Sequence, residues 1–105
     1  MARPMAYTLL DKVTRPGPGL RIKDTEAFTV ASLQLVYTGK RVAVVLKGQM
    51  LGSPVESTIR MIDSLTWKSG RIVKLDDWPV GIEEVWAEVT AIDAGEVSLY
   101  FCGRD

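Results

Sequence analysis

The feature that most constrains this chain is the alternation of apolar and polar residues in short segments that turn-forming residues separate. The final segment shows it best, because Val97, Leu99 and Phe101 alternate with Ser98 and Tyr100. A period of two places one set of side chains on each face of a β-strand, whereas an amphipathic helix needs a period near 3.6. No segment has a convincing helical period. We therefore expect an all-β chain of about eight short strands, folded as a β-sandwich or a small barrel.

The expected strands follow one another closely along the chain. They lie at residues 20–23, 27–37, 41–47, 58–62, 65–68, 71–75, 85–91 and 97–101. A change of parity at Ala31-Ser32 predicts a β-bulge inside the second of them. Residues 41–47 are apolar on both faces, which predicts a strand that is covered on both sides or pressed against a partner. The last two strands, joined by a turn at residues 93–95, are expected to form a hairpin.

The first 18 residues have a different composition from the rest. They contain three of the five prolines, at Pro4, Pro16 and Pro18, together with basic residues. Proline restricts its own backbone and that of the preceding residue to extended or turn geometry. We therefore expect an N-terminal arm at residues 1–18 and one sandwich domain at residues 19–105, since a chain of 105 residues normally has a single core.

Charge and cysteine content exclude several classes of protein. The chain has 13 basic and 13 acidic residues, so no net charge draws it to nucleic acid or to an anionic membrane. Its single cysteine, Cys102, cannot close an internal disulfide, and no apolar run is long enough to span a bilayer. Synthesis in the cytoplasm, with neither nucleic acid nor a membrane as partner, is the expectation.

The sequence lacks the residues that most catalytic sites use. There is no histidine, which removes the commonest general base and the commonest metal ligand. The acidic pairs Asp76-Asp77 and Glu83-Glu84 leave acid–base work or metal binding open, but neighbours on an extended chain point in opposite directions. We expect no enzyme activity, no catalytic or metal-binding residue, and no cofactor.

The three tryptophans are the candidate recognition residues. Trp67 is expected in the core, whereas Trp78 precedes a proline in a loop and Trp86 lies opposite the apolar face of its strand. We expect Trp78 and Trp86 to be exposed and to contact a partner protein. A glycan-binding module, in which tryptophans form a platform for sugars, is the alternative.

The chain resembles small β-sandwich virion proteins of tailed bacteriophages, of the capsid decoration or cement type. The resemblance covers residues 19–37, the valine-rich segment 42–48, and residues 65–67, 85–91 and 95–103. This sequence departs from the family's pattern at residues 49–64, where an insertion replaces a short turn. The resemblance implies a jelly-roll-like sandwich that decorates a capsid, or else a component of the tail or the head-tail connector.

Together these observations predict a structural protein on the capsid surface of a virion. Its expected partners are the major capsid protein and other copies of itself, as a symmetric dimer or trimer. The residues expected to make contact are Tyr7, Leu9 and Leu10 in the arm, and Trp78 and Trp86 on the domain.

Overall fold

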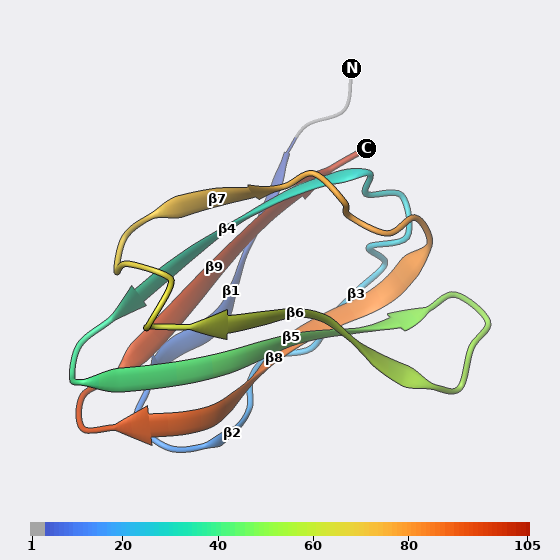
Figure 1. Ribbon diagram of the computed structural model, residues 1–105. Coiled ribbons are helices and arrows are strands. Elements are labelled where there is room, and N and C mark those ends of the chain that lie inside the picture. The colour runs from blue at the N-terminus through green and yellow to red at the C-terminus, as the bar shows by residue number, and fades with distance from the viewer. Residues whose placement is uncertain (1–3) are drawn as a thin grey trace.

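The protein is a two-layered β-sandwich. The computed structural model describes residues 4–105, and Figure 1 shows strands throughout. The strands are β1 (Met5–Val13), β2 (Gly17–Pro18), β3 (Ile22–Lys23), β4 (Val30–Tyr37), β5 (Arg41–Met50), β6 (Glu56–Asp63), β7 (Ile72–Leu75), β8 (Ile82–Asp93) and β9 (Val97–Arg104). Sheet A has the order β1-β9-β4-β7, and sheet B the order β2-β8-β5-β6, with β3 also paired to β8. The predicted all-β sandwich is confirmed.

The strands pair as if the chain were first folded into one long antiparallel hairpin, which is then wound up to form the two sheets. β1 pairs with β9, β2 and β3 pair with β8, β4 pairs with β7, and β5 pairs with β6, all antiparallel. Winding places β4 beside β9 and β5 beside β8, which completes the two sheets. With β2 and β3 counted as one interrupted strand, this is the eight-stranded jelly-roll arrangement.

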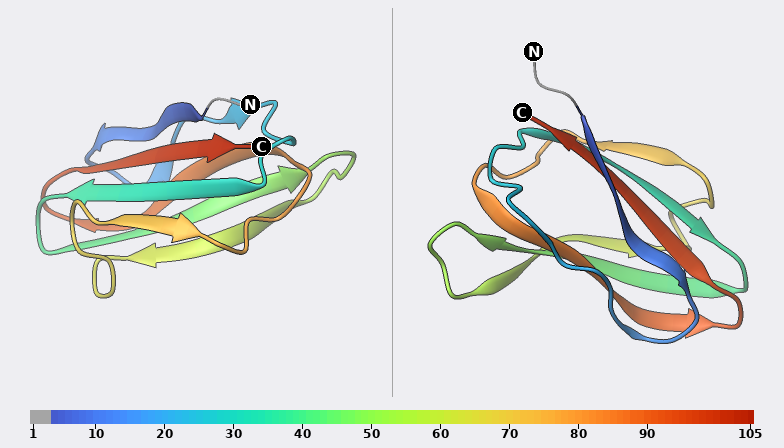
Figure 2. Two further views of the ribbon diagram at one scale, coloured as in Figure 1. Left: turned by 90° about the horizontal axis from the view of Figure 1, so that it is seen from above. Right: turned by 180° about the vertical axis from the view of Figure 1, so that it is seen from behind.

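The expected hairpin between the last two strands is wrong. β8 belongs to sheet B and β9 to sheet A, so the turn between them carries the chain from one sheet to the other (Figure 2). The turn between β4 and β5 crosses in the same way, and the two turns hold each other: the Lys40 N–H donates to the Asp93 carbonyl at 3.2 Å. Gly39, with φ of 92°, allows this approach, since a Cβ there would collide with the Ala94 carbonyl oxygen.

Two smaller expectations also fail. The pairing of β4 with β9 runs from Val30 to Tyr37 without a shift, so no bulge lies at residues 31–32. The parity change arises because the strand begins only at Val30, and Phe28 reaches the core from the preceding loop. Residues 65–68 form a turn rather than a strand, although Trp67 is buried there, as predicted.

The segment predicted to be an arm is largely part of the sandwich. Residues 1–3 lie outside the described residues, but β1 pairs with β9 along an edge of sheet A. Leu9 and Leu10 are 1% and 2% exposed and belong to the core. The proline-rich composition does not exclude strands here. Pro18 lies in β2 at an edge of sheet B, where its missing N–H does not interrupt the hydrogen bonds between strands. The sandwich therefore begins at β1 and not at residue 19.

Aromatic rings fill one end of the space between the sheets. The Phe101 ring lies 6.2 Å from that of Tyr7, 6.1 Å from that of Phe28 and 5.3 Å from that of Trp78, measured between centroids. Tilted pairs at such distances add favourable electrostatics to the burial of apolar area. These rings close the sandwich beneath the loops at residues 24–29 and 76–81.

Asp63, at the end of β6, links the fold to pH. Its carboxylate accepts a hydrogen bond from the Leu65 N–H at 2.9 Å and another from Arg41 at 3.2 Å. The first bond, with help from Arg41, lowers the pKa of Asp63 below its usual value of 3.8. A lowered folded-state pKa stabilises the fold above the unfolded-state pKa, and this stabilisation is lost as the pH falls through the folded-state value.

We predict that Asp63→Asn makes the stability less dependent on pH. The wild type is expected to be the more stable protein at pH 7. The difference should begin to shrink as the pH falls below about 4, the usual pKa of an unfolded aspartate, and should be smallest below the folded-state pKa, where Asp63 is protonated in both states. Urea denaturation of both proteins at a series of pH values measures this. A difference that stays constant down to pH 2 would contradict the assigned role of the carboxylate.

Candidate functional site

The outer face of sheet A is the candidate site, and it is broad and almost uncharged. The strand register places side chains in two rows across the sheet, Ala6–Cys102–Ser32–Lys74 and Thr8–Tyr100–Gln34–Ile72. We call the surface made by these eight residues, with Val30, Val36 and Arg104 at its ends, the sheet A face. Its two charged residues, Lys74 and Arg104, are both basic and lie at its border. An uncharged surface loses little hydration energy when another protein covers it.

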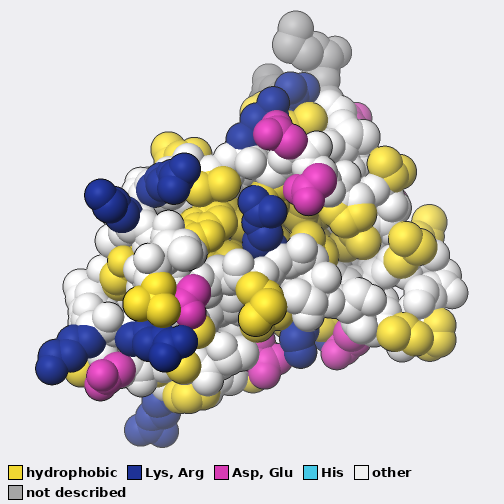
Figure 3. All heavy atoms as spheres, in the orientation of Figure 1, with side chains coloured by type: hydrophobic (Ala, Val, Ile, Leu, Met, Phe, Trp, Pro, Cys, Tyr) yellow, Lys and Arg dark blue, Asp and Glu magenta, His cyan; other side chains and the backbone are white. Residues whose placement is uncertain are grey.

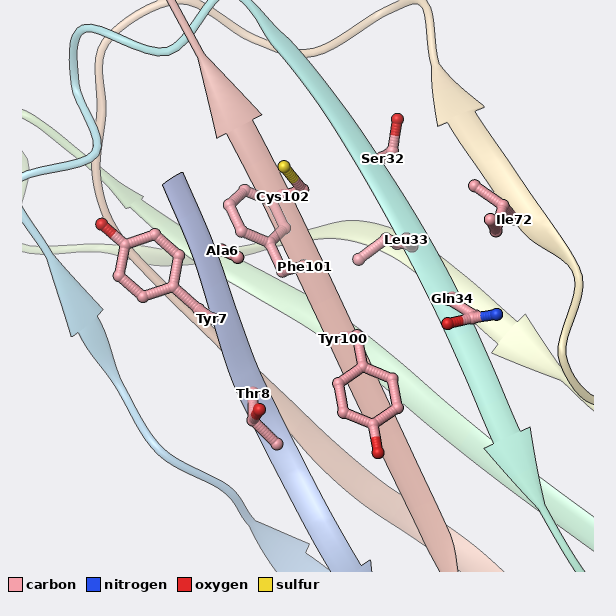
Figure 4. Close-up of a pocket in the computed structure, with 10 residues that line it drawn as sticks. All are labelled: Ala6, Tyr7, Thr8, Ser32, Leu33, Gln34, Ile72, Tyr100, Phe101 and Cys102. Atoms are coloured by element: carbon pink, nitrogen blue, oxygen red, sulfur yellow. The ribbon is translucent and has the colours of Figure 1, made fainter. Parts of the chain in front are cut away.

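A hollow of about 280 Å³ lies on this face and is lined by residues of β1, β4, β7 and β9. Figure 4 shows Tyr100 at one end of the hollow, with the shorter side chains of Ser32 and Cys102 beyond it. Tyr100 is 41% exposed and Ile72 is 69% exposed, so both are available to a partner. The Gln34 amide donates to the Gly70 carbonyl at 2.9 Å, which fixes the orientation of its side chain. The hollow can therefore accept an apolar group and offers a phenol at its edge.

A second exposed feature is the tip of the β5–β6 hairpin, residues 50–55, which projects beyond the sandwich (Figure 1). Met50, Leu51 and Val55 are each more than half exposed, and Val80 in the adjoining loop is 72% exposed. Figure 3 shows hydrophobic side chains gathered on this side of the molecule. Exposed apolar groups gathered in this way commonly mark a protein-binding surface.

Neither the arm residues nor the tryptophans form the exposed contact surface predicted from the sequence. Leu9 and Leu10 lie in the core, and Tyr7 packs inward against Phe28 and Phe101. Trp78 is only 5% exposed, because the loop that carries it folds over the open end of the sandwich and places the ring on Phe101.

Trp86 is also buried, although the prediction of its direction was right. It lies on the outer face of sheet B, where the guanidinium carbon of Arg21 is 3.7 Å from the ring centroid. Arg21 also forms ion pairs with Glu56 at 2.7 Å and Glu84 at 3.3 Å. Trp86 is 3% exposed, so its ring does not offer the exposed platform for sugars that the alternative, a glycan-binding module, requires.

Arg21→Ala is expected to uncover the Trp86 ring and to lower the free energy of unfolding by about 1 kcal/mol. The value is small because Arg21 is partly exposed, so solvent screens both its ion pairs and its contact with the ring. Urea denaturation and quenching of tryptophan fluorescence by acrylamide test this, with Lys68→Ala as a control for losing an exposed cation. Unchanged quenching would mean that Arg21 does not cover the ring in solution.

The acidic pairs do not assemble into a metal site in the described part of the chain. Between residues 4 and 105, no three or more histidine, cysteine or carboxylate side chains come together to bind an ion. Asp76 instead forms an ion pair with Lys74, with 3.4 Å between Oδ1 and Nζ, and Glu84 forms ion pairs with Arg21 and Lys23. Over the same range, no helix has the length and hydrophobicity that a membrane crossing requires.

Comparison with known proteins identifies the fold. No protein-family model matches the chain, and no curated protein matches its sequence. The crystal structure of the SPBc2 prophage-derived protein YomS is similar over 100% of this chain and 96% of that one, with a TM-score of 0.74 and 11% sequence identity. The chain shares its fold with YomS. At this identity the similarity concerns the arrangement of the strands and not the residues of a site.

Sequence reasoning missed the sheet A face, although part of the signal was present. The alternation in residues 97–101 places Tyr100 opposite the core residues Leu99 and Phe101, which is the orientation observed. The missing information was which strands flank β9, because β1 and β4 supply Thr8 and Gln34 only through long-range pairing.

Proposed function

We propose that this chain is a non-enzymatic structural protein of a tailed-bacteriophage particle. In this proposal it decorates or cements the capsid, by binding major capsid subunits and other copies of itself. The observation that supports it most is the broad, nearly uncharged sheet A face with its hollow, a surface suited to adhesion. The fold shared with a prophage-derived protein and the resemblance of the sequence to phage decoration proteins supply the phage context.

The physical case rests on what a repeating lattice needs. A capsid presents many identical sites, so a protein that stabilises it needs a rigid body and a complementary surface rather than a reaction centre. A jelly-roll sandwich holds Tyr100, Gln34 and Ile72 at fixed positions on neighbouring strands. Little conformational entropy is then lost when the face is covered, which favours tight binding.

The proposal is tested with particles of the phage that encodes the chain, grown without this gene. Purified protein is added separately to heads and to tails, and bound protein is measured after gradient sedimentation. We expect saturable binding to heads, at least tenfold weaker for Tyr100→Asp, which places a charge at the hollow. Leu65→Asp is the matched control, since Leu65 is 77% exposed in a turn away from the sheet A face.

Each other result contradicts a stated part of the proposal. Binding to tails alone would overturn the decoration role, and binding to neither particle would overturn the function. Equal binding of the wild type and of a folded Tyr100→Asp variant would remove the sheet A face from the contact.

A further inference from the structure

We propose that the hollow on the sheet A face receives the β5–β6 tip of a second copy of this chain. This inference rests on the proposed function, in which the sheet A face binds protein, and it identifies the bound segment as the β5–β6 tip. The tip, residues 50–55, and the hollow are the projecting and the recessed apolar features of the same molecule.

The composition of the tip suits entry into an apolar hollow. From Gly48 to Val55 no residue carries a charge, and Met50, Leu51 and Val55 are 51%, 58% and 63% exposed. Burying such side chains is favourable by roughly 25 cal/mol per Å² of apolar area. The hollow is lined without any charged side chain, so closing it leaves no charge without water.

Hydrogen bonds hold the tip in one shape before it binds. The Leu51 N–H donates to the Gly81 carbonyl at 2.8 Å, which ties the tip to the loop before β8. The Gln49 amide donates to the Ser53 carbonyl at 2.7 Å, and the Ser53 N–H donates to the Met50 carbonyl at 2.9 Å. A preformed tip loses less entropy on docking than a flexible one.

Two charged residues without an ion-pair partner in the described part of the chain, Arg104 on the sheet A face and Asp77 beside the tip, have opposite signs. The charged residues of the sheet A face are Lys74 and Arg104, both basic, whereas Glu56 and Asp77 flank the tip and are both acidic. Lys74 is held by Asp76, and Glu56 by Arg21, but Arg104 and Asp77 form no ion pair within residues 4–105. This complementarity favours a second copy as the occupant and orients its approach.

The sheet edges offer a poorer route to self-association. β6, at one edge of sheet B, has an extra residue where Leu46 and Lys47 pair with Arg60 and Thr58, and β2 and β3 at the other edge have two residues each. At the edges of sheet A, β1 has two register shifts and β7 has only four residues. Bulges and short edge strands oppose pairing with another chain, so edge-to-edge pairing does not compete with the contact between tip and hollow.

A copy cannot fill its own hollow, since the tip extends sheet B (Figure 2). The hollow is lined by outward-facing residues of sheet A. The contact therefore joins two different surfaces and builds either a closed ring or an open chain of copies. A closed ring of two or three copies agrees with the symmetric dimer or trimer expected from the sequence.

The deciding experiment mixes two variants, each with one defective surface. Leu51→Asp alters the tip and Tyr100→Asp alters the hollow, while Leu65→Asp controls for an acidic residue elsewhere. Analytical ultracentrifugation should show concentration-dependent assembly of the wild type and of Leu65→Asp, and at least tenfold weaker assembly of each tip or hollow variant. An equal mixture of the two should form dimers and nothing larger, since one intact tip and one intact hollow remain.

A cross-link gives a second readout that does not depend on a charge substitution. Cys102 is the only cysteine and lines the hollow. A short bismaleimide should therefore join Leu51→Cys chains, which carry a cysteine at the tip and another at the hollow, into dimers and larger species. It should not do so with Leu65→Cys chains. A Leu51→Cys/Cys102→Ser chain has one cysteine and can form dimers at most. A ladder of species larger than dimers in Leu51→Cys alone supports the contact.

Three results would overturn the inference: a wild type that stays monomeric at millimolar concentration, a variant mixture without dimers, or a cross-linking ladder that is as strong in Leu65→Cys as in Leu51→Cys. These measurements use the purified chain alone. Loss of self-association with intact head binding would remove only this inference, whereas intact self-association without head binding would remove only the proposed function.

Discussion

Removing residues 1–14 is expected to abolish folding. The deletion takes away β1, and with it Leu9 and Leu10, which are almost completely buried. Loss of one buried leucine side chain typically costs 2–5 kcal/mol, and small domains are stable by only about 5–15 kcal/mol. The deletion also leaves the hydrogen-bonding edge of β9 unpaired, which invites aggregation.

Circular dichroism during thermal unfolding measures this effect. The truncated chain should show no cooperative transition, while a chain that lacks only residues 1–4 and keeps all of β1 should unfold like the wild type. A truncated chain that still unfolds cooperatively near the wild-type temperature would mean that residues 5–13 are an arm after all.

Trp78→Ala is expected to lower the free energy of unfolding by about 3–5 kcal/mol, the range seen when a buried aromatic side chain is truncated. The ring lies 5.3 Å from that of Phe101 and seals the end of the core, so its removal leaves a cavity that the loop at residues 76–81 cannot easily fill. We therefore expect the main role of the Trp78 ring to be stabilisation of the fold.

Trp78→Phe is the matched control. It keeps a ring in the core and removes the indole N–H, for which no acceptor is found among the described residues. Because a buried donor without a partner is itself unfavourable, we expect Phe to cost clearly less than Ala. Urea denaturation compares the three proteins, and a loss below about 1 kcal/mol for Trp78→Ala would contradict the burial of this ring.

The sequence predicts well which face of a strand each side chain occupies, but it predicts poorly which strands lie side by side in a sheet. Alternation correctly directs Leu99 and Phe101 into the core and Tyr100 outward, because the geometry of a strand fixes this locally. It says nothing about which strand lies beside β9. The short glycine-containing turns after β4 and β8 resemble hairpin turns in sequence, yet both carry the chain between sheets.

The sequence also does not predict which side chains are buried within loops or beneath long side chains from other strands. The direction of Trp86 follows from its parity, but its burial depends on Arg21, which lies 65 positions earlier and reaches the ring from the edge of sheet B. The candidate site was missed for a similar reason, because Thr8, Tyr100 and Gln34 form one row only after the chain is wound into a jelly roll.

Residues 49–64, where the sequence departs from the pattern of the phage decoration proteins that it resembles, include the part of the chain that projects beyond the sandwich (Figure 1). They contain the end of β5, the β5–β6 tip and all of β6. The projecting residues 50–55 can change which surfaces meet, while β6 supplies Ile62 to the core.

We expect the sheet A face to be covered by protein when the chain is bound to the phage head. A cryo-EM map of heads saturated with the purified chain tests it most directly. We predict that Tyr100 and the hollow beside it lie in a protein contact in every bound copy, whether with a capsid subunit or with the tip of a neighbour. A map in which the chain is bound while the sheet A face is open to solvent would contradict the claim.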